Sequence, residues 1–307
     1  MRKPSLAVEF AGLRFKNPVM TASGTCGYAE ELVPYADLKG LGAVIVKTIT
    51  LLPRVGNPAP RLAETPSGML NSIGLQNVGI EAFLRDKLPL LRRLKVPILV
   101  NIAGKSVEEY AELAKRLDGV PGVSALELNI SCPNVAGGLD YGTDPQLTRE
   151  VVRSVKQACG LPVIPKLSPN VTDITVIARA AADGGADALS LINTLLGVAI
   201  DPHGRRPKIH TVTGGLSGPA IKPVALRMVW QVSQAVPLPL IGIGGIQTGE
   251  DAVEFLLAGA TAVQVGTATF VDPRAPLRVR DGIVAYCARH GVPDVRTLVG
   301  ALRTDGE

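Results

Sequence analysis

Short apolar runs rich in valine, isoleucine and leucine recur along the chain and alternate with segments of helical periodicity. Eight runs have the length and composition of buried strands, at residues 19–22, 43–46, 98–100, 125–128, 163–165, 188–192, 240–243 and 262–265. Eight strands separated by helices are what a parallel (β/α)8 barrel requires. We therefore predict an α/β fold, a TIM barrel that spans residues 1–307 as one domain.

Polar residues mark the starts of several helices between these strands. Ser106 has Glu109 three residues after it, which is the spacing of a capping box. Further N-caps are predicted at Asp144, at Asp173 or Thr172, and at Thr248. The predicted helices therefore alternate with the strands, as the barrel requires.

Side chains or glycines suited to ligand binding follow most of the predicted strands. They are Ser23, Lys47, Asn101, Asn129, Lys166, Asn193, Gly244 and Gly266. The C-terminal ends of barrel strands face one cavity, so these residues are expected to converge there. Any one of them alone is more simply explained as a turn or capping residue, but eight in order favour a functional site.

Two connections are longer than an ordinary turn between a strand and a helix. Residues 48–78 follow the second strand and residues 193–217 follow the sixth. Such excursions on the catalytic face are typical of lids and substrate loops. The first contains Asn71-Ser72-Ile73-Gly74-Leu75-Gln76-Asn77, which offers amide and backbone donors, with turn-forming asparagines as the alternative. The second contains residues 201–210, which we interpret as a solvated loop rather than a lid.

Glycines follow the last two strands, where barrels often hold a phosphate on backbone N–H groups. Gly242-Ile243-Gly244-Gly245 ends the seventh strand, and Gly266-Thr267 follows the eighth. A dinucleotide fingerprint is not indicated, because Gln247 stands where GxGxxG needs its last glycine. The pattern indicates a phosphate but not the molecule that carries it.

Two cations and a cysteine supply the candidate chemistry. Lys47 and Lys166 end strands, and beside a flavin such a lysine stabilises negative charge that develops as the ring accepts hydride. Cys132 lies shortly after the fourth strand, and a thiol with an ordinary pKa of about 8.5 can act as a base near neutral pH. The absence of a histidine at any predicted strand end disfavours a Cys–His hydrolase.

Composition narrows the classes of function. With 46% hydrophobic residues the chain can bury a large core. Apolar segments are interrupted by a charge or a proline before they reach 18 residues, so no membrane span is predicted. The N-terminal segment has no signal-peptide core, which indicates a cytoplasmic protein. A net charge of +5 without a basic stripe, together with 4% aromatic residues, does not favour nucleic acid. The four cysteines form no CxxC motif, and no metal site is predicted.

Six motifs together give the chain a family resemblance. They are Thr21-Ala22-Ser23-Gly24, Val46-Lys47-Thr48, the stretch at residues 71–77, Asn129-Ile130-Ser131-Cys132-Pro133-Asn134, Ile192-Asn193-Thr194, and Gly214-Gly215-Leu216-Ser217-Gly218-Pro219-Ala220-Ile221-Lys222-Pro223. In this order, over nearly the whole chain, they resemble the dihydroorotate dehydrogenases, and in particular the catalytic subunits of the NAD-linked class 1B. The combination of motifs is highly specific.

The resemblance implies a cofactor, a substrate and a base. FMN is expected at Ser23, Lys47, Thr48, Asn101, Asn129, Lys166, Ile192, Gly218, Gly244, Gly245, Gly266 and Thr267. Orotate or dihydroorotate is expected at Lys47, Asn71, Ser72, Ile73, Gly74, Leu75, Asn129, Asn193 and Thr194. Cys132 matches the family's catalytic base, and the loop after the fourth strand is expected to close over the substrate.

The resemblance also implies a partner. In class 1B, electrons reach NAD through a subunit that carries FAD and a [2Fe–2S] cluster, so a heterotetramer of two catalytic and two partner subunits is expected. Class 2 enzymes have a serine base and an N-terminal membrane-associating extension, whereas this chain has Cys132 and begins almost at the barrel. The alternatives are a fumarate-linked class 1A enzyme, another FMN barrel acting on dihydropyrimidines, a phosphate-binding isomerase or lyase, and an inactive assembly subunit.

Overall fold

An eight-stranded parallel sheet forms the centre of the computed structural model, which describes residues 4–131 and 141–304. Its strands are β3 (Val19–Thr21), β4 (Val44–Ile45), β7 (Ile98–Ile102), β8 (Ala125–Asn129), β9 (Val163–Leu167), β10 (Leu189–Leu191), β15 (Leu240–Ile243) and β16 (Ala262–Val265). Each corresponds to one of the eight predicted runs, and no strand end differs from the prediction by more than two residues.

The sheet closes into a barrel. From β4 to β16 each strand pairs in parallel with its neighbour in chain order, and β16 pairs with β3. A parallel bridge between Met20 and Ala43 joins β3 to the segment of β4, beside a 2.8 Å hydrogen bond that the Gly42 N–H donates to the Val19 carbonyl. The TIM barrel expected from the sequence is therefore confirmed.

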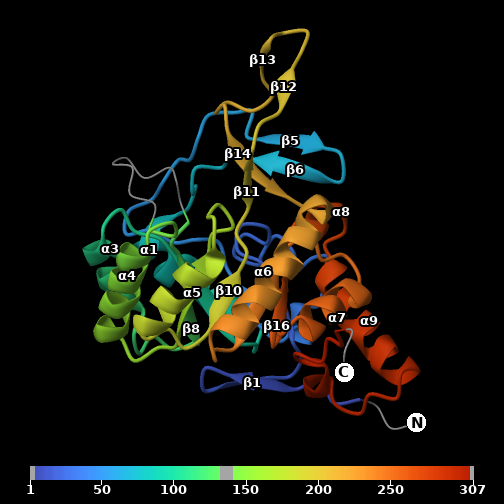
Figure 1. Ribbon diagram of the computed structural model, residues 1–307. Coiled ribbons are helices and arrows are strands. Elements are labelled where there is room, and N and C mark those ends of the chain that lie inside the picture. The colour runs from blue at the N-terminus through green and yellow to red at the C-terminus, as the bar shows by residue number, and fades with distance from the viewer. Residues whose placement is uncertain (1–3, 132–140, 305–307) are drawn as a thin grey trace.

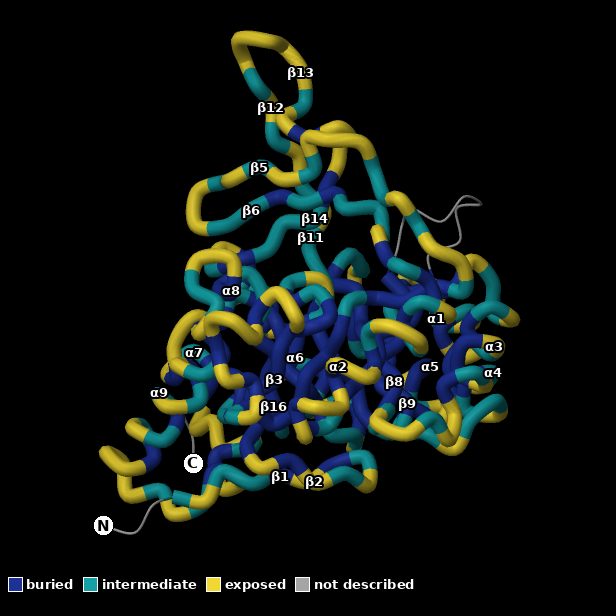
Figure 2. Tube along the Cα trace, turned by 180° about the vertical axis from the view of Figure 1, so that it is seen from behind, coloured by how far each residue is buried: buried dark blue, intermediate teal, exposed yellow. Residues whose placement is uncertain are grey.

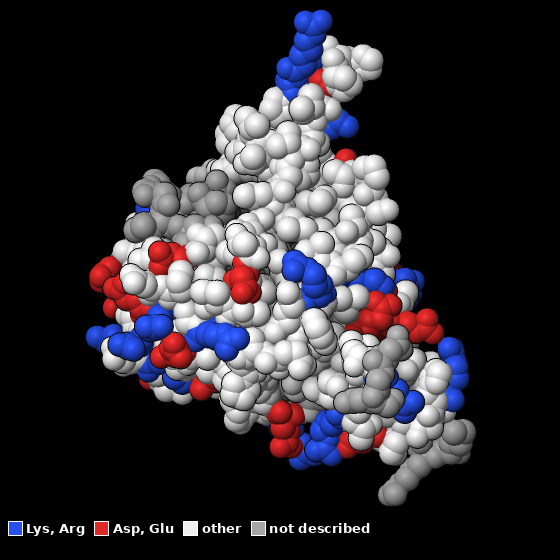
Figure 3. Space-filling model, in the orientation of Figure 1, with Lys and Arg blue, Asp and Glu red and all other residues white. Residues whose placement is uncertain are grey.

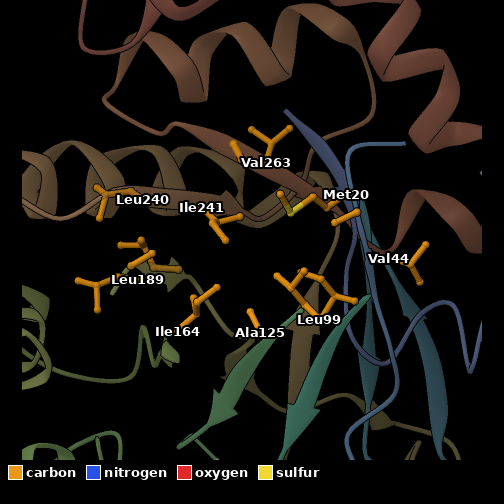
Figure 4. Close-up of a cluster of buried hydrophobic side chains, with 14 of the residues drawn as sticks. Met20, Val44, Leu99, Ala125, Ile164, Leu189, Leu240, Ile241 and Val263 are labelled. Carbon is orange, nitrogen blue, oxygen red and sulfur yellow. The ribbon is translucent and has the colours of Figure 1, made fainter. Parts of the chain in front are cut away.

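Apolar side chains from all eight strands form one buried cluster (Figure 4). The labelled members are Met20, Val44, Leu99, Ala125, Ile164, Leu189, Leu240, Ile241 and Val263. Helices cover the outside of the sheet and side chains fill its inside, so each strand is buried on both faces and its sequence is nearly continuous in apolar residues. This double burial is why short aliphatic runs alone identified the strands.

Helices surround the barrel (Figure 1). The longer ones are α3 (Val107–Leu117), α4 (Pro145–Ala158), α5 (Ile174–Asp183), α6 (Lys222–Ala235), α7 (Gly249–Leu257) and α9 (Ala275–Arg289). The shorter ones are η1 (Leu38–Gly40), α1 (Gly79–Ala82), η2 (Phe83–Lys87), α2 (Leu88–Arg92), η3 (Pro219–Ile221), α8 (Ala268–Val271) and η4 (Val295–Leu298). Consecutive longer helices contact one another from α3 round to α9 and form the outer layer.

Most of the predicted helix caps are confirmed. Asp144, Asp173 and Thr248 each accept a backbone N–H at the start of α4, α5 and α7. The predicted capping box at α3 is only half formed. Ser106 accepts the Glu109 N–H at 3.4 Å, but the Glu109 carboxylate accepts the N–H of Lys105 instead of that of Ser106.

The two long connections combine into one antiparallel sheet above the barrel, which we call the cap sheet. Its strands, in spatial order, are β11 (Leu195–Gly197), β14 (Gly214–Ser217), β6 (Gly68–Asn71) and β5 (Leu62–Thr65). The sequence predicted lids or loops here and missed this sheet, because its strands are short and contain several glycines. At the opposite end of the barrel lies the hairpin of β1 (Val8–Phe10) and β2 (Leu13–Phe15) (Figure 1).

A hairpin projects from the cap sheet. It consists of β12 (Ile200–Asp201) and β13 (Arg206–Pro207), and the turn between them is exposed (Figure 2). Most of residues 201–210 are exposed, as interpreted from the sequence, but Ile209 is buried and the segment is more regular than a loop. On the face shown in Figure 3, basic and acidic side chains intermingle around the barrel helices, and Lys and Arg lie at the hairpin tip. Within the described ranges, no helix is both long and apolar enough to cross a membrane.

Candidate active site

A cavity of about 560 Å³ lies between the C-terminal ends of the barrel strands and the cap sheet. Its wall includes all eight residues predicted at the strand ends, namely Ser23, Lys47, Asn101, Asn129, Lys166, Asn193, Gly244 and Gly266. The cap side contributes the segment from Asn71 to Leu75, together with Thr194 and Gly215. The predicted convergence of these residues is confirmed, and the cavity has a volume typical of cofactor sites.

The charged groups of the cavity wall are cations. Lys47 and Lys166 line it, and no Asp or Glu occurs among its described lining residues. Lys166 is only 7% exposed, so its ammonium group lies in a poorly solvated environment where an anion interacts strongly with it. This arrangement favours a ligand with phosphate, carboxylate or electron-rich ring groups.

The backbone of Thr194 fixes the amide orientation of Asn193, and Asn193 in turn fixes that of Asn129. The Thr194 N–H donates to Asn193 Oδ1 at 2.8 Å, so the NH2 group of Asn193 is the donor in its 3.3 Å bond to Asn129 Oδ1. Asn129 consequently keeps its own NH2 group available to a ligand. The Asn129 backbone is held as well, because its carbonyl accepts a 2.6 Å hydrogen bond from the Tyr110 hydroxyl.

In a third asparagine, Asn101, the NH2 group is occupied and the side-chain oxygen is the atom without a partner among the described residues. The Asn101 NH2 group donates to Glu127 Oε2 at 2.6 Å, and Gln264 donates its NH2 group to Glu127 Oε1 at 2.6 Å. Asn101 Oδ1 is buried and has no hydrogen-bond partner within the described residues. A buried amide oxygen without a partner is costly unless a ligand donates to it. The strand-end asparagines therefore offer one acceptor, at Asn101, and one donor, at Asn129.

The segment 71–77 is held against the barrel by one buried asparagine. The Asn77 NH2 group donates to Thr50 Oγ1 and to the Leu75 backbone carbonyl, each at 2.8 Å, and Asn77 Oδ1 accepts the Gly79 N–H at 2.8 Å. On the cap side, the Asn71 NH2 group donates to the Gly215 carbonyl at 3.2 Å, which leaves Asn71 Oδ1 to accept from a ligand.

The glycines after β15 allow a close approach of three backbone segments. Gly244 and Gly245 have φ angles of 137° and 72°, which L side chains rarely adopt. A Cβ on Gly245 would lie 2.7 Å from the Lys222 Cβ and 3.0 Å from the Gly218 carbonyl oxygen. Only glycine fits here, and its backbone is exposed to the cavity.

Lys222, which packs against Gly245, is held by ion pairs with two carboxylates of α7. Lys222 at the start of α6 donates to Asp251 on α7 at 2.5 Å and to Glu254 at 3.1 Å. Burial raises the pKa of Asp251, but hydrogen bonds from Lys222 and from the N–H groups of Gln247 and Thr248 outweigh it and lower that pKa below its usual value. Asp251 is therefore ionised at neutral pH.

The remaining predicted residues fall into three groups. The wall of the cavity also contains Thr48, Ser72, Ile73, Gly74, Gly218 and Thr267. Ile192 does not line it, because its side chain is 2% exposed in the core. Cys132 and the loop expected to close over the substrate lie outside the described residues, so their roles stay predictions.

The sequence did not single out several residues that the structure places at the site. Asn170 lines the cavity, donates to the Thr194 carbonyl at 3.0 Å and accepts from the Leu196 N–H at 2.9 Å. The Ser217 hydroxyl accepts from Thr267 at 2.9 Å. Glu127 was passed over as part of an apolar strand, although a carboxylate inside such a run was a usable signal.

The three described cysteines are not candidates for acid–base chemistry. Burial raises the pKa of Cys26 to about 11 and also raises the pKa values of Cys159 and Cys287. None of the three lines the cavity. Among the cysteines, Cys132 therefore remains the candidate base.

Comparison with known proteins gives consistent results. The family model described as dihydroorotate dehydrogenase matches residues 5–286. A relative from Geobacter sp. (strain M21), named "Dihydroorotate dehydrogenase B (NAD(+)), catalytic subunit", is 60% identical over 303 residues, which are 98% of this chain and 99% of the relative. A protein of the same name from Desulforudis audaxviator is 60% identical over 305 residues, or 99% of each chain. The crystal structure of DHODH from Eimeria tenella in complex with ferulenol superposes with a TM-score of 0.80 at 26% identity, covering 97% of this chain and 88% of that one.

Proposed function

The chain belongs to the dihydroorotate dehydrogenase family, and from that premise we propose that it oxidises (S)-dihydroorotate to orotate in de novo pyrimidine synthesis. The observation that carries the proposal is the cavity itself. Its charged groups are cationic and its amides present both donors and acceptors, as a flat anionic ring bearing carbonyls and N–H groups requires.

The described residues fit FMN as the cofactor. Asn101 lines the cavity, and its Oδ1 is buried and lacks a partner among the described residues, so it suits an N–H of a ligand ring. We propose that FMN is held by Ser23, Lys47, Thr48, Asn101, Asn129, Lys166, Gly218, Gly244, Gly245, Gly266 and Thr267. Ile192 belongs to this set by the family resemblance alone, because it is buried in the core and does not line the cavity. When bound, FMN supplies the acceptor for the hydride that leaves C6 of the substrate.

The substrate side of the cavity is proposed to be formed by the cap sheet and two strand ends. Its residues are Lys47, Asn71, Ser72, Ile73, Gly74, Leu75, Asn129, Asn193 and Thr194. Lys47 provides a positive charge for the carboxylate, while the Asn129 NH2 group and Asn71 Oδ1 provide a donor and an acceptor for the ring. Residues 71–75 hold this geometry because Asn77 anchors the end of their segment.

Cys132 is proposed to act as the base. Its thiolate takes the proton from C5, and the electron pair of that C–H bond forms the C5–C6 double bond of orotate as hydride leaves C6. The adjacent ring carbonyl makes the C5 proton acidic. Lys166 stabilises negative charge that develops at the site, because it is poorly solvated and faces no carboxylate among the described wall residues.

The names of the relatives support a separate partner subunit, because they describe a "catalytic subunit" of an NAD-linked enzyme. We propose that electrons reach NAD through a partner carrying FAD and a [2Fe–2S] cluster, in an assembly of two catalytic and two partner chains. A cytoplasmic location is part of the same proposal. Efficient reduction of NAD by the isolated chain would contradict the route through a partner, and reduction of fumarate instead of NAD would contradict the NAD-linked assignment.

Anaerobic titration of the purified chain with dihydroorotate tests the reaction. We expect a yellow protein whose flavin absorbance bleaches. In Cys132→Ala, FMN binding is expected to persist while flavin reduction slows by about 10²-fold to 10⁴-fold, as loss of a positioned base implies. A wild-type flavin that stays oxidised would direct attention to other dihydropyrimidines. Wild-type rates in the variant would remove Cys132 from the mechanism.

A further inference from the structure

We propose that Glu127 is a positioning residue that makes Asn101 a hydrogen-bond acceptor toward the bound flavin. The inference rests on the proposed function, because the flavin is the ligand that Asn101 is expected to face. Glu127 lies on β8, is completely buried and does not line the cavity. It therefore touches neither ligand and acts only through its neighbours.

The carboxylate of Glu127 dictates the orientation of two amides. A side-chain amide can present either its oxygen or its NH2 group, and its surroundings decide which. Both carboxylate oxygens of Glu127 act as acceptors, because Asn101 and Gln264 each turn their NH2 group toward it. Both donor–acceptor distances are 2.6 Å, which is shorter than the usual N–H···O range.

The consequence reaches the cavity through Asn101 alone. Gln264 does not line the cavity, whereas Asn101 does. With its NH2 group held by Glu127, Asn101 is left with a buried side-chain oxygen that lacks a partner among the described residues. A flavin ring carries both N–H donors and carbonyl acceptors, so the amide end that faces it determines which ring atoms fit there. Glu127 thus determines that Asn101 is an acceptor toward the flavin, although Glu127 itself does not contact the flavin.

An exchange of the two side chains tests this arrangement. In Glu127→Gln, the residue at position 127 accommodates either end of Asn101, so the amide is no longer fixed. In the double variant Glu127→Gln/Asn101→Asp, the carboxylate moves to position 101. One oxygen of this carboxylate is expected to accept from the NH2 group introduced at position 127, and the other is left for the ligand. The amide oxygen introduced at position 127 is expected to accept from the Gln264 NH2 group. Ser190→Ala is the matched control, because Ser190 is also buried in a barrel strand but its hydroxyl has no described partner.

The readout is the dissociation constant of FMN from the apoprotein, followed by quenching of flavin fluorescence, with thermal unfolding as the check of folding. We expect about tenfold weaker binding in Glu127→Gln, which corresponds to the loss of one hydrogen bond. The double variant is expected to recover to within about threefold of wild type, and Ser190→Ala to bind as wild type does.

A purely structural role for Glu127 would make the two substitutions additive, so a double variant weaker than Glu127→Gln would overturn the inference. Unchanged FMN binding in Glu127→Gln would overturn it too. The double variant and Glu127→Gln decide the matter even if Asn101→Asp alone does not fold. A wild-type protein that binds no FMN, or whose flavin dihydroorotate leaves oxidised, would instead overturn the proposed function.

Discussion

Gly245→Ala is expected to damage both stability and cofactor binding. An alanine at a φ of 72° costs about 1–2 kcal/mol in backbone conformation. The added methyl group would lie 2.7 Å from the Lys222 Cβ and 3.0 Å from the Gly218 oxygen, and overpacking of this kind costs about 1–3 kcal/mol. Lys222 cannot yield freely, because it is paired with Asp251 and Glu254. We therefore expect the free energy of unfolding to fall by about 2–5 kcal/mol.

To relieve these close contacts, the backbone at Gly245 would have to move, and this backbone lines the cavity. Loss of one charge-assisted hydrogen bond to the FMN phosphate would weaken binding by about tenfold to a hundredfold. Gly119→Ala is the matched control. Gly119 has a φ of 65° but nothing within 4 Å of its added Cβ, and it does not line the cavity. Denaturant unfolding and FMN titration of both variants separate the effects. Equal FMN affinity in the two variants would refute the assignment of Gly245 to the cofactor site.

Two further predictions concern ionisable groups. Asp251→Asn is expected to lower the free energy of unfolding by about 1–2 kcal/mol at neutral pH. Because the folded-state pKa of Asp251 is lowered, its contribution is present above its ordinary pKa of 3.8 and disappears as the pH falls through the folded value. Denaturant unfolding should therefore show the difference from wild type shrinking below about pH 4, and a constant difference would contradict the ion-pair interpretation. Iodoacetamide near pH 7.5 is expected to modify Cys132 first and leave Cys26 intact, because the pKa of Cys26 is about 11. Peptide mass spectrometry checks this, and preferential labelling of Cys26 would show the thiol assignment to be wrong.

The sequence predicted the barrel and its strand-end residues because both depend on local pattern. Strands buried on both faces are apolar throughout, and the residue after each such strand faces the cavity in any barrel of this type. The cap sheet escaped prediction because it pairs β6 with β14, a long-range contact between short segments without a strong period. Asn170 was missed because it lies three residues beyond β9 and reaches the site only through the turn that follows. The orientations of Asn101 and Asn129 depend on tertiary hydrogen bonds that no single segment encodes.

The cap sheet also bears on how the chain is made. Asn71 pairs with Gly215, and Met69 pairs with Ser217, so the sheet joins segments that leave the ribosome well apart in time. Strands β7 to β10 all lie between them in the chain. Closing so long a loop costs entropy that local contacts do not, and the pairing is expected to form late in folding. A nascent chain that ends before residue 214 contains most of the barrel strands but no β6–β14 pairing. The substrate side of the cavity is therefore completed only after most of the barrel has been synthesised.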